Sequence, residues 1–292
     1  MHALAKVHDR VGSTIAGARL GWLLGIGQYA AVYAAEHPGY GAIAVKVLHA
    51  DLAARADVRA RFEREIDLTR SLAHAGILQV FDDGTSDDTR YAFLERLEGE
   101  SLDARLVRMG GRLPLREVRM GGRLPLREVR STLSDALEVM AFVHSQGVVH
   151  RDLSPKNVFL ARSGVVYVLD FGIAASPRAS ALTRSGQVLG TPSFMAPEQA
   201  RGESAKATTR TDVWSLGAMA FRLLAGRDVH PARSPNAQVL VAASYPAPPI
   251  TKLAPRVPLS LAAVIDRALS FEPADRFADA GEMRAAWLSS PA

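Results

Sequence analysis

The chain has 292 residues, of which 48% are hydrophobic and 22% charged, with a formal net charge of +5 and no cysteine. This composition is that of a globular protein with one large or one two-lobed domain. The absence of cysteine excludes disulfides and thiolate metal sites, and it fits a protein of the reducing cytoplasm. No apolar run is long enough to span a membrane, and residues 1–20 lack the apolar core of a secretory signal. The arginines are spread along the chain, so we expect neither a membrane nor a nucleic-acid partner despite the positive charge.

The first hundred residues predict a sheet and one helix. Residues 51–74 contain no Gly or Pro and are rich in helix formers, with Phe62, Ile66, Thr69 and Leu72 at helical spacing. Apolar alternation and turn residues predict strands over 18–27, 30–37, 41–48, 77–84 and 90–97.

Beyond about residue 101 the pattern becomes helical. Residues 131–147 predict a helix that ends before Gly147, with Leu133, Leu137, Met140 and His144 on one face. Residues 211–226 predict an apolar helix ended by Gly226. A small sheet-rich part followed by a larger helical part is an α+β layout, with a ligand cleft expected near the joint at 95–99.

A perfect repeat interrupts the helical part, since the eleven residues 108–118 recur unchanged as 119–129. Two such copies cannot stack into a solenoid. Leu124 and Leu126 around Pro125 are expected to begin the long helix, with the proline in its first turn and the first copy as the surplus. A tolerated duplication is the favoured interpretation, and docking of an acidic partner on the added arginines is the alternative.

Three features in the chain can carry chemistry. Gly25 and Gly27 lie between two predicted strands, where bare backbone can approach phosphate; the segment after them predicts a strand and not a helix, which disfavours a Rossmann turn. Lys46 stands in the middle of an apolar strand, where an ammonium group needs an anionic partner such as Glu65, unless it reaches solvent from an edge strand.

The third feature is a pair of acids. The segments "VVHRDLSPKN" and "VYVLDFG" both predict an apolar strand that delivers an acid, Asp152 in one and Asp170 in the other. Asn157 follows Asp152 by five residues. Two carboxylates and an amide oxygen are suited to binding a divalent metal beside a phosphate.

Taken in order, the motifs of this chain resemble those of the eukaryotic-like (Hanks-type) protein kinases, particularly the bacterial serine/threonine group. The resemblance covers about residues 20–287 and rests on "GIGQYAAV", "AVK", "FEREI", "HRDLSPKN", "DFG", "GTPSFMAPE", "TDVWSLG" and "PADRF". It implies a bilobal α+β kinase fold with a small antiparallel-sheet N-lobe that contains one key helix. The implied limits are an N-terminal extension 1–17, an N-lobe 18–94, a hinge 95–99 and a helical C-lobe 100–290, with the duplication at 108–129.

The resemblance further implies transfer of the γ-phosphoryl group of ATP to Ser/Thr hydroxyls of protein substrates, with Mg²⁺ or Mn²⁺. Asp152 would orient the acceptor hydroxyl and take its proton. Lys46, fixed by Glu65, would hold the α- and β-phosphates, while Asn157 and Asp170 hold the metal ion. The residues implied to contact ATP are Gly25, Gly27, Val32, Ala44, Lys46, Leu94 (the gatekeeper), Glu95, Leu97 and Phe159.

Other matches are architectural or regulatory. Glu198 is implied to pair with Arg276, Asp212 to brace the backbone of the catalytic loop, and Thr191 to help hold Asp152. Arg151 directly before Asp152 implies an activation segment ordered by phosphorylation, with autophosphorylation expected at Thr183 or Ser185. The alternative is that these two are ordinary loop hydroxyls.

Two positions depart from the family pattern. Ser154 stands where these kinases carry a lysine that contacts the γ-phosphate, which implies a lower rate, and Ala30 stands at the third glycine of the first motif. The alternative functions are an ATP-binding pseudokinase scaffold and a small-molecule phosphotransferase. The chain ends five residues after Trp287, so we expect regulation by a partner protein or by phosphorylation. The oligomeric state stays open.

Overall fold

The computed structural model describes residues 9–109, 123–171 and 191–291. Two predictions therefore lie outside the described residues: the phosphorylation of Thr183 and Ser185, and the behaviour of most of the first repeat copy. The chain divides into two compact units, Met1–Glu98 and Gly99–Ala292.

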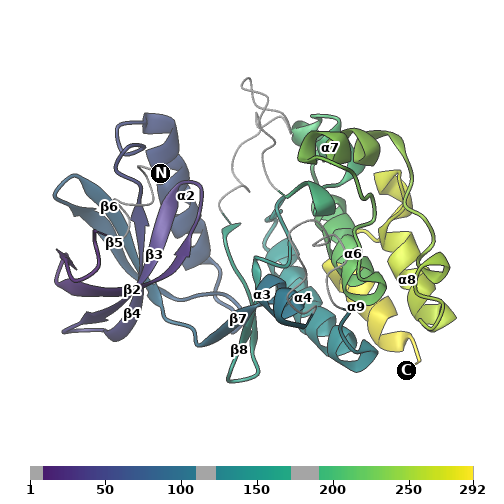
Figure 1. Ribbon diagram of the computed structural model, residues 1–292, viewed down its shortest axis with the longest axis horizontal. Helices are drawn as coiled ribbons and strands as arrows, with labels where there is room; N and C mark the ends of the chain where they lie inside the picture. Colours follow the sequence, from purple (N-terminus) through teal and green to yellow (C-terminus); the bar gives the residue numbers. More distant parts are fainter. Residues whose placement is uncertain (1–8, 110–122, 172–190, 292) are drawn as a thin grey trace. The chain divides into compact units, whose positions relative to one another are not determined.

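The first unit is an antiparallel sheet with one long helix (Figure 1). The sheet has six strands in the order β1-β2-β3-β4-β6-β5. Their bounds are β1 (Thr14–Ile15), β2 (Ala18–Ile26), β3 (Ala30–His37), β4 (Gly41–Leu48), β5 (Val80–Ser86) and β6 (Thr89–Glu95), and helix α2 spans Ala56–Ser71. The predicted strands are confirmed. The helix is shorter than predicted at both ends. Residues 51–54 form turns, Arg55 is the N-cap and donates its N–H to the Leu52 carbonyl, and the helix ends at Ser71.

Each face of this sheet has its own apolar core. Tyr33, Val45 and Phe93 are among the buried residues of one cluster. Phe62 and Ile66 of α2 belong to the other cluster. Because side chains alternate along a strand, every second residue of β4 lies on the side that α2 covers.

The second unit begins with a small sheet and continues as helices (Figure 1). The sheet is β7 (Gly99–Ser101), β8 (Val158–Ala161) and β9 (Val166–Val168), in that order. The helices are α3 (Leu102–Met109), α4 (Leu126–Ser145), α5 (Pro197–Ala200), α6 (Thr209–Ala225), α7 (Pro235–Ser244), α8 (Leu259–Ala268) and α9 (Ala280–Ser289). Short 3₁₀ turns are η2 (Pro192–Phe194), η3 (Ser204–Lys206), η4 (Ile250–Lys252) and η5 (Pro273–Asp275).

Helix α6 forms the centre of the second unit. Of its 17 residues, 14 are buried, and it ends at Gly226 in the left-handed conformation that the sequence predicts (φ 73°). A Cβ atom at Gly217 would lie 2.8 Å from the Cβ of Ala268 in α8. A larger residue at this position would therefore push these two helices apart.

Two local predictions are wrong. Residues 148–150 form no strand, because the backbone N–H of His150 donates to the Asp212 carboxylate and not to a strand ladder. Helix α4 begins at Leu126, so Pro125 is its N-cap and does not lie in its first turn. The predicted end of the same helix is confirmed, since Gly147 has a left-handed backbone (φ 72°) one residue after the C-cap Gln146.

No helix in the described parts of the chain is long and apolar enough to cross a membrane.

Candidate active site

In the first unit, Lys46 of β4 and Glu65 of α2 form an ion pair. Their Nζ and Oε1 atoms are 2.5 Å apart, and both side chains are 13% exposed. The pairing predicted from the sequence is therefore present. Lys46 lies in the interior of the sheet, opposite Val32 on β3 and Ala92 on β6, so the carboxylate offsets much of the cost of placing an ammonium group there.

The apolar residues expected around adenine share the α2 side of the sheet. Ala44 and Leu94 are paired across β4 and β6. Both are buried in the cluster that also contains Phe62, and Val32 packs against that cluster. Ala44 and Lys46 are two residues apart, so they lie on the same face of β4. Ala44, a predicted adenine contact, and Lys46, the predicted phosphate contact, thus follow one another along β4.

The two glycines lie at the end of the β2–β3 hairpin. Gly25 is opposite Val32, and the Gly27 N–H donates to the Ala30 carbonyl at 2.8 Å. A Cβ atom at Gly25 would meet no atom within 4 Å. Packing within the protein does not require a glycine at this position, so its bare backbone is left accessible to a ligand.

The remaining predicted ATP contacts are half-buried. Glu95 is the last residue of β6, opposite Ile43, and Leu97 follows two residues later. Phe159 is on β8 of the second unit, opposite Tyr167 of β9.

In the second unit, Asp212 holds the backbone of the loop that carries Asp152. Its Oδ2 accepts from the His150 N–H at 2.7 Å, and its Oδ1 accepts from the Arg151 N–H at 2.8 Å. The carboxylate is fully buried at the start of α6. Asp212 therefore braces this loop as predicted. Its hydrogen bonds satisfy the backbone N–H groups that strand pairing would have used.

Hydrogen bonds join Asn157 to Asp152 and to Leu169, the residue before Asp170. The Asn157 side-chain amide donates to the Asp152 carbonyl at 2.8 Å, and the Leu169 N–H donates to the Asn157 carbonyl at 2.8 Å. The His150 ring lies 3.0 Å from the Leu169 carbonyl. The loop with Asp152 is thereby tied to the residue directly before Asp170.

The carboxyl group of Asp152 is partly buried, and this burial raises its pKa. His150, the Thr191 N–H and Lys156 act in the opposite direction, while the Asp170 charge raises the pKa further. The Thr191 N–H lies 3.3 Å from Oδ1 of Asp152, so Thr191 contacts this acid through its backbone. The raised pKa is what a proton acceptor needs, because a stronger base takes a proton more readily.

Two residues at these positions have a strained backbone. Arg151 (φ 68°) and Asp170 (φ 59°) have a left-handed backbone conformation, which residues other than glycine seldom adopt. Such strain concentrates at functional sites, where the surrounding contacts hold it in place.

The structure also places the two departures from the kinase pattern. Ser154 is buried and Lys156 is exposed, and the Lys156 charge acts on Asp152. Ala30 is buried in the α2-side core.

Glu198 and Arg276 form a buried ion pair. Two hydrogen bonds of 2.9 Å join the guanidinium group to both carboxylate oxygens, and Thr211 also donates to Glu198. Burial alone would raise the pKa of Glu198, but Arg276 outweighs it and the pKa is lowered. The predicted pairing is present and joins α5 to the segment before α9.

Sequence reasoning missed a polar network around η2. Ser193 and Gln238 both donate to Oδ2 of Asp228, at 2.9 and 3.1 Å, and Arg222 donates to Oδ1 at 2.8 Å. The network ties the "GTPSF" turn to α6 and α7. No local pattern could reveal it, because the partners are up to 45 residues apart and each is an ordinary surface residue type.

Sequence reasoning also missed the hydrogen bonds of His144, which it placed only on one face of the predicted helix 131–147. Its Nδ1 accepts from the Ala280 N–H at 3.1 Å, so Nε2 bears the proton that it donates to Asp212 at 3.0 Å. His144 therefore joins α4, α6 and α9 to the bracing carboxylate.

In the described residues there is no group of three or more His, Asp or Glu side chains placed to hold a metal ion. Asn157 and Asp170 fit a different kind of site. Magnesium is commonly held by one or two protein oxygens together with the phosphates of a nucleotide.

A lysine–glutamate pair on a sheet with one long helix, followed by a helical unit with an acid-bearing braced loop, defines the class of the protein kinases. The kinase domain of PknI from Mycobacterium tuberculosis has a similar fold, with 29% sequence identity and a TM-score of 0.70 over 95% of this chain and 98% of that one. The family described as protein kinase domain matches residues 19–288. The chain belongs to this family, and the bilobal kinase fold predicted from its motifs is confirmed.

Similar proteins include bacterial serine/threonine kinases. Pkn1 of Myxococcus xanthus is 36% identical over 280 residues, which are 94% of this chain and 38% of that protein. PknB of Mycobacterium leprae is 33% identical over 276 residues, 91% of this chain and 42% of that protein. The chain thus spans about two fifths of the length of these relatives.

Proposed function

We propose that the chain is the catalytic part of a protein kinase that transfers the γ-phosphoryl group of ATP to serine and threonine hydroxyls of proteins. The observation that carries this proposal is the braced loop, in which both oxygens of Asp212 hold the backbone beside Asp152. The names of the relatives, which are serine/threonine kinases, favour the same acceptor class.

Asp152 then orients the acceptor hydroxyl and takes its proton, for which burial has raised the pKa of its carboxyl group. Lys46 binds the α- and β-phosphates while Glu65 holds its ammonium group in position. Catalysis of this kind depends mainly on positioning and electrostatics.

ATP and a divalent metal ion fit the residues present. Asp170 and Asn157 offer a carboxylate and an amide oxygen, the ligands that magnesium prefers, and manganese uses the same donors. The chemistry that the ion supplies in this class is neutralisation of charge on the phosphates. Gly25 and Gly27 would cover the phosphates, with Val32, Ala44, Leu94, Glu95, Leu97 and Phe159 around the adenine.

The domain limits predicted above remain part of this proposal, as do a cytoplasmic location, which the lack of cysteine favours, and a regulatory protein partner. We also propose that Arg151 binds a phosphate on the activation segment, at Thr183 or Ser185. Its Nε is buried and has no hydrogen-bond partner among the described residues, as expected of a guanidinium group that pairs with a phosphate.

The test is incubation with radiolabelled ATP and magnesium, comparing the wild-type chain with Asp152→Ala and the exposed control Asp51→Ala. We expect label on serine and threonine for the wild type and the control, and a loss of at least about a hundredfold for Asp152→Ala. Mass spectrometry of the labelled chain locates the phosphates. Equal label in all three proteins would refute the kinase assignment, whereas ATP binding without transfer in the wild type would make the chain a scaffold.

A further inference from the structure

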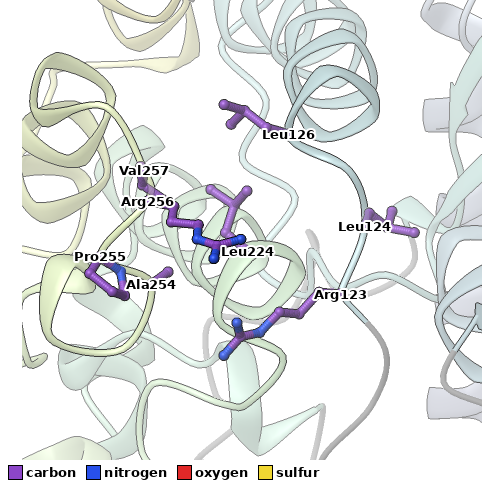
Figure 2. Close-up of a pocket in the computed structure, with 8 residues that line it drawn as sticks. All are labelled: Arg123, Leu124, Leu126, Leu224, Ala254, Pro255, Arg256 and Val257. Carbon is purple, nitrogen blue, oxygen red and sulfur yellow. The ribbon is translucent and has the colours of Figure 1, made fainter.

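A hollow in the second unit is lined by the start of α4, the end of α6 and the loop before α8 (Figure 2). Four of its apolar lining residues are only 4% to 7% exposed: Leu124, Leu224, Ala254 and Val257. They offer a ligand little apolar surface, so the lining gives no reason to expect a binding site there. A role that does follow from the contacts belongs to a histidine of the first unit.

His49 directly follows β4 and bonds the turn between β2 and β3 at two points. Its backbone N–H donates to the Tyr29 carbonyl at 2.9 Å. Its ring Nε2 lies 3.0 Å from the Gly27 carbonyl oxygen. Because a carbonyl oxygen can only accept, Nε2 bears a proton and donates it. His49 thus fastens the two sides of the turn that carries Gly27.

The hydrogen bonds of the turn itself do not fix the Gly27 carbonyl. The Gly27 N–H donates to the Ala30 carbonyl at 2.8 Å, but residues 28 and 29 form a bend and not a hydrogen-bonded turn. In the part of the chain that the structure describes, the group bonded to the Gly27 carbonyl is the His49 ring. Since glycine allows its backbone many conformations, the orientation of this carbonyl depends on His49.

The other side of the turn is anchored by the side chain of Tyr29. Its ring is half-buried against the α2-side core, and the guanidinium carbon of Arg61 on α2 lies 5.1 Å from the ring centre. Loss of the His49 ring would therefore free the Gly27 carbonyl and leave the rest of the hairpin in place.

The direction of the Gly27 carbonyl also sets the direction of the next N–H group. In a planar trans peptide the C=O and N–H groups point in opposite directions. The bond from His49 to the Gly27 carbonyl therefore turns the Gln28 N–H away from the His49 ring. Gln28 is exposed, and its N–H has no acceptor among the described residues. An exposed backbone N–H beside a glycine is a suitable donor for a phosphate oxygen.

We propose that His49 is a positioning residue for the phosphates of ATP. His49 does not touch the nucleotide; it holds the Gly27–Gln28 peptide so that the Gln28 N–H donates to a phosphate oxygen. This role rests on the proposed function, in which Gly25 and Gly27 cover the phosphates, and adds to it a residue from outside the glycine motif. Because the effect passes through a phosphate contact, binding of adenosine alone does not depend on His49.

The experiment measures by calorimetry how tightly the full chain binds ATP with magnesium, and how tightly it binds adenosine. His49→Ala should weaken ATP binding about fivefold, the value of one hydrogen bond, and change adenosine binding by less than about twofold. His49→Gln should recover most of the ATP affinity, because its side-chain amide keeps an N–H donor at a similar distance from the backbone.

The matched control is His37→Ala. The His37 ring also bonds a turn of the same sheet, since its Nδ1 accepts from the Gly39 and Tyr40 N–H groups between β3 and β4. This turn lies at the other end of β3, so His37→Ala should bind ATP as the wild type does. The melting temperatures of all variants show that they are folded.

Four outcomes would overturn the role of His49: unchanged ATP affinity in His49→Ala, an equal loss of ATP and adenosine affinity, no recovery in His49→Gln, or an equal loss of ATP affinity in His37→Ala. A wild type that binds ATP but transfers no phosphate would refute the kinase function and leave the role of His49 intact. A wild type that binds no ATP would refute both.

Discussion

At the scale of single residues, burial controls the acid–base behaviour of Asp152. A group with a raised pKa keeps its proton to a higher pH than an exposed aspartate, so the basic form that the reaction needs is lost earlier as the pH falls. Lys156 works against this, because its positive charge lowers the pKa of Asp152.

We therefore predict that Lys156→Ala moves the acid limb of the kcat/KM profile to higher pH. Removing the cation raises the pKa of Asp152 further, so activity at low pH falls more than activity at high pH. The measurement is peptide phosphorylation across the pH range by both proteins in the same buffers, in which the titration of ATP cancels. A uniform loss at every pH would show that Lys156 acts on the phosphates and not on Asp152.

At the scale of elements, the Glu198–Arg276 pair joins α5 to the segment before α9 at a place without solvent. Removing one partner leaves the other as an unpaired charge in the core, which costs about 3–5 kcal/mol. Arg276 also lies over the ring of Trp214, so its loss removes packing as well as charge.

We predict that Arg276→Ala lowers the free energy of unfolding by about 3–5 kcal/mol near neutral pH. The matched control is Lys206→Ala, which breaks the exposed Lys206–Glu203 pair and should cost less than about 1 kcal/mol. Urea unfolding measures both.

The stability that the Glu198–Arg276 pair contributes depends on pH in a defined direction. Because the folded-state pKa of Glu198 is lowered, the stability it contributes is present above the ordinary pKa of glutamate and is lost as the pH falls through the lowered value. The difference between wild type and Arg276→Ala should shrink in acid. A difference that is equal at all pH values would attribute the loss to packing alone.

Local pattern explains which elements the sequence could predict. The alternation in β3 and β4 and the left-handed Gly147 and Gly226 are signals contained within a few residues, and each is where the sequence placed it. The strand expected at 148–150 does not form, because apolar residues alone do not provide a neighbouring strand to bond with. The His150 N–H donates instead to Asp212, some sixty residues later.

The same reasoning applies to the candidate site. The ion pairs Lys46–Glu65 and Glu198–Arg276 could be predicted because family motifs carry both partners. The Asp228 network and the bonds of His144 could not, because their partners are brought together only by the packing of α4, α6, α7 and α9.

At the scale of the whole molecule, the question is whether the protein needs both copies of the repeat. The contacts of the described part use Arg108 from the first copy, bonded to Glu100, and Arg123 and Leu124 from the second. Because the copies are identical, removing residues 108–118 leaves a sequence that still supplies both ends.

We predict that deletion of residues 108–118 leaves kinase activity unchanged. Stability should stay the same or rise by about 1–2 kcal/mol, because the connection to be closed is shorter. Thermal unfolding and phosphorylation of a peptide measure the two effects. Loss of either one would give the additional copy a function, and binding of an acidic partner by the wild type alone would identify it as docking.

The anchoring of both ends of the repeat also concerns how such a chain can change. Arg108 fastens the end of α3 and Arg123 fastens the approach to α4, so the number of residues between them is set by neither anchor. Slippage between identical copies of the underlying coding sequence would add or remove eleven residues while both anchors stay in place. This connection is therefore a natural insertion point, where a reporter or a second domain can be introduced between two fixed helices.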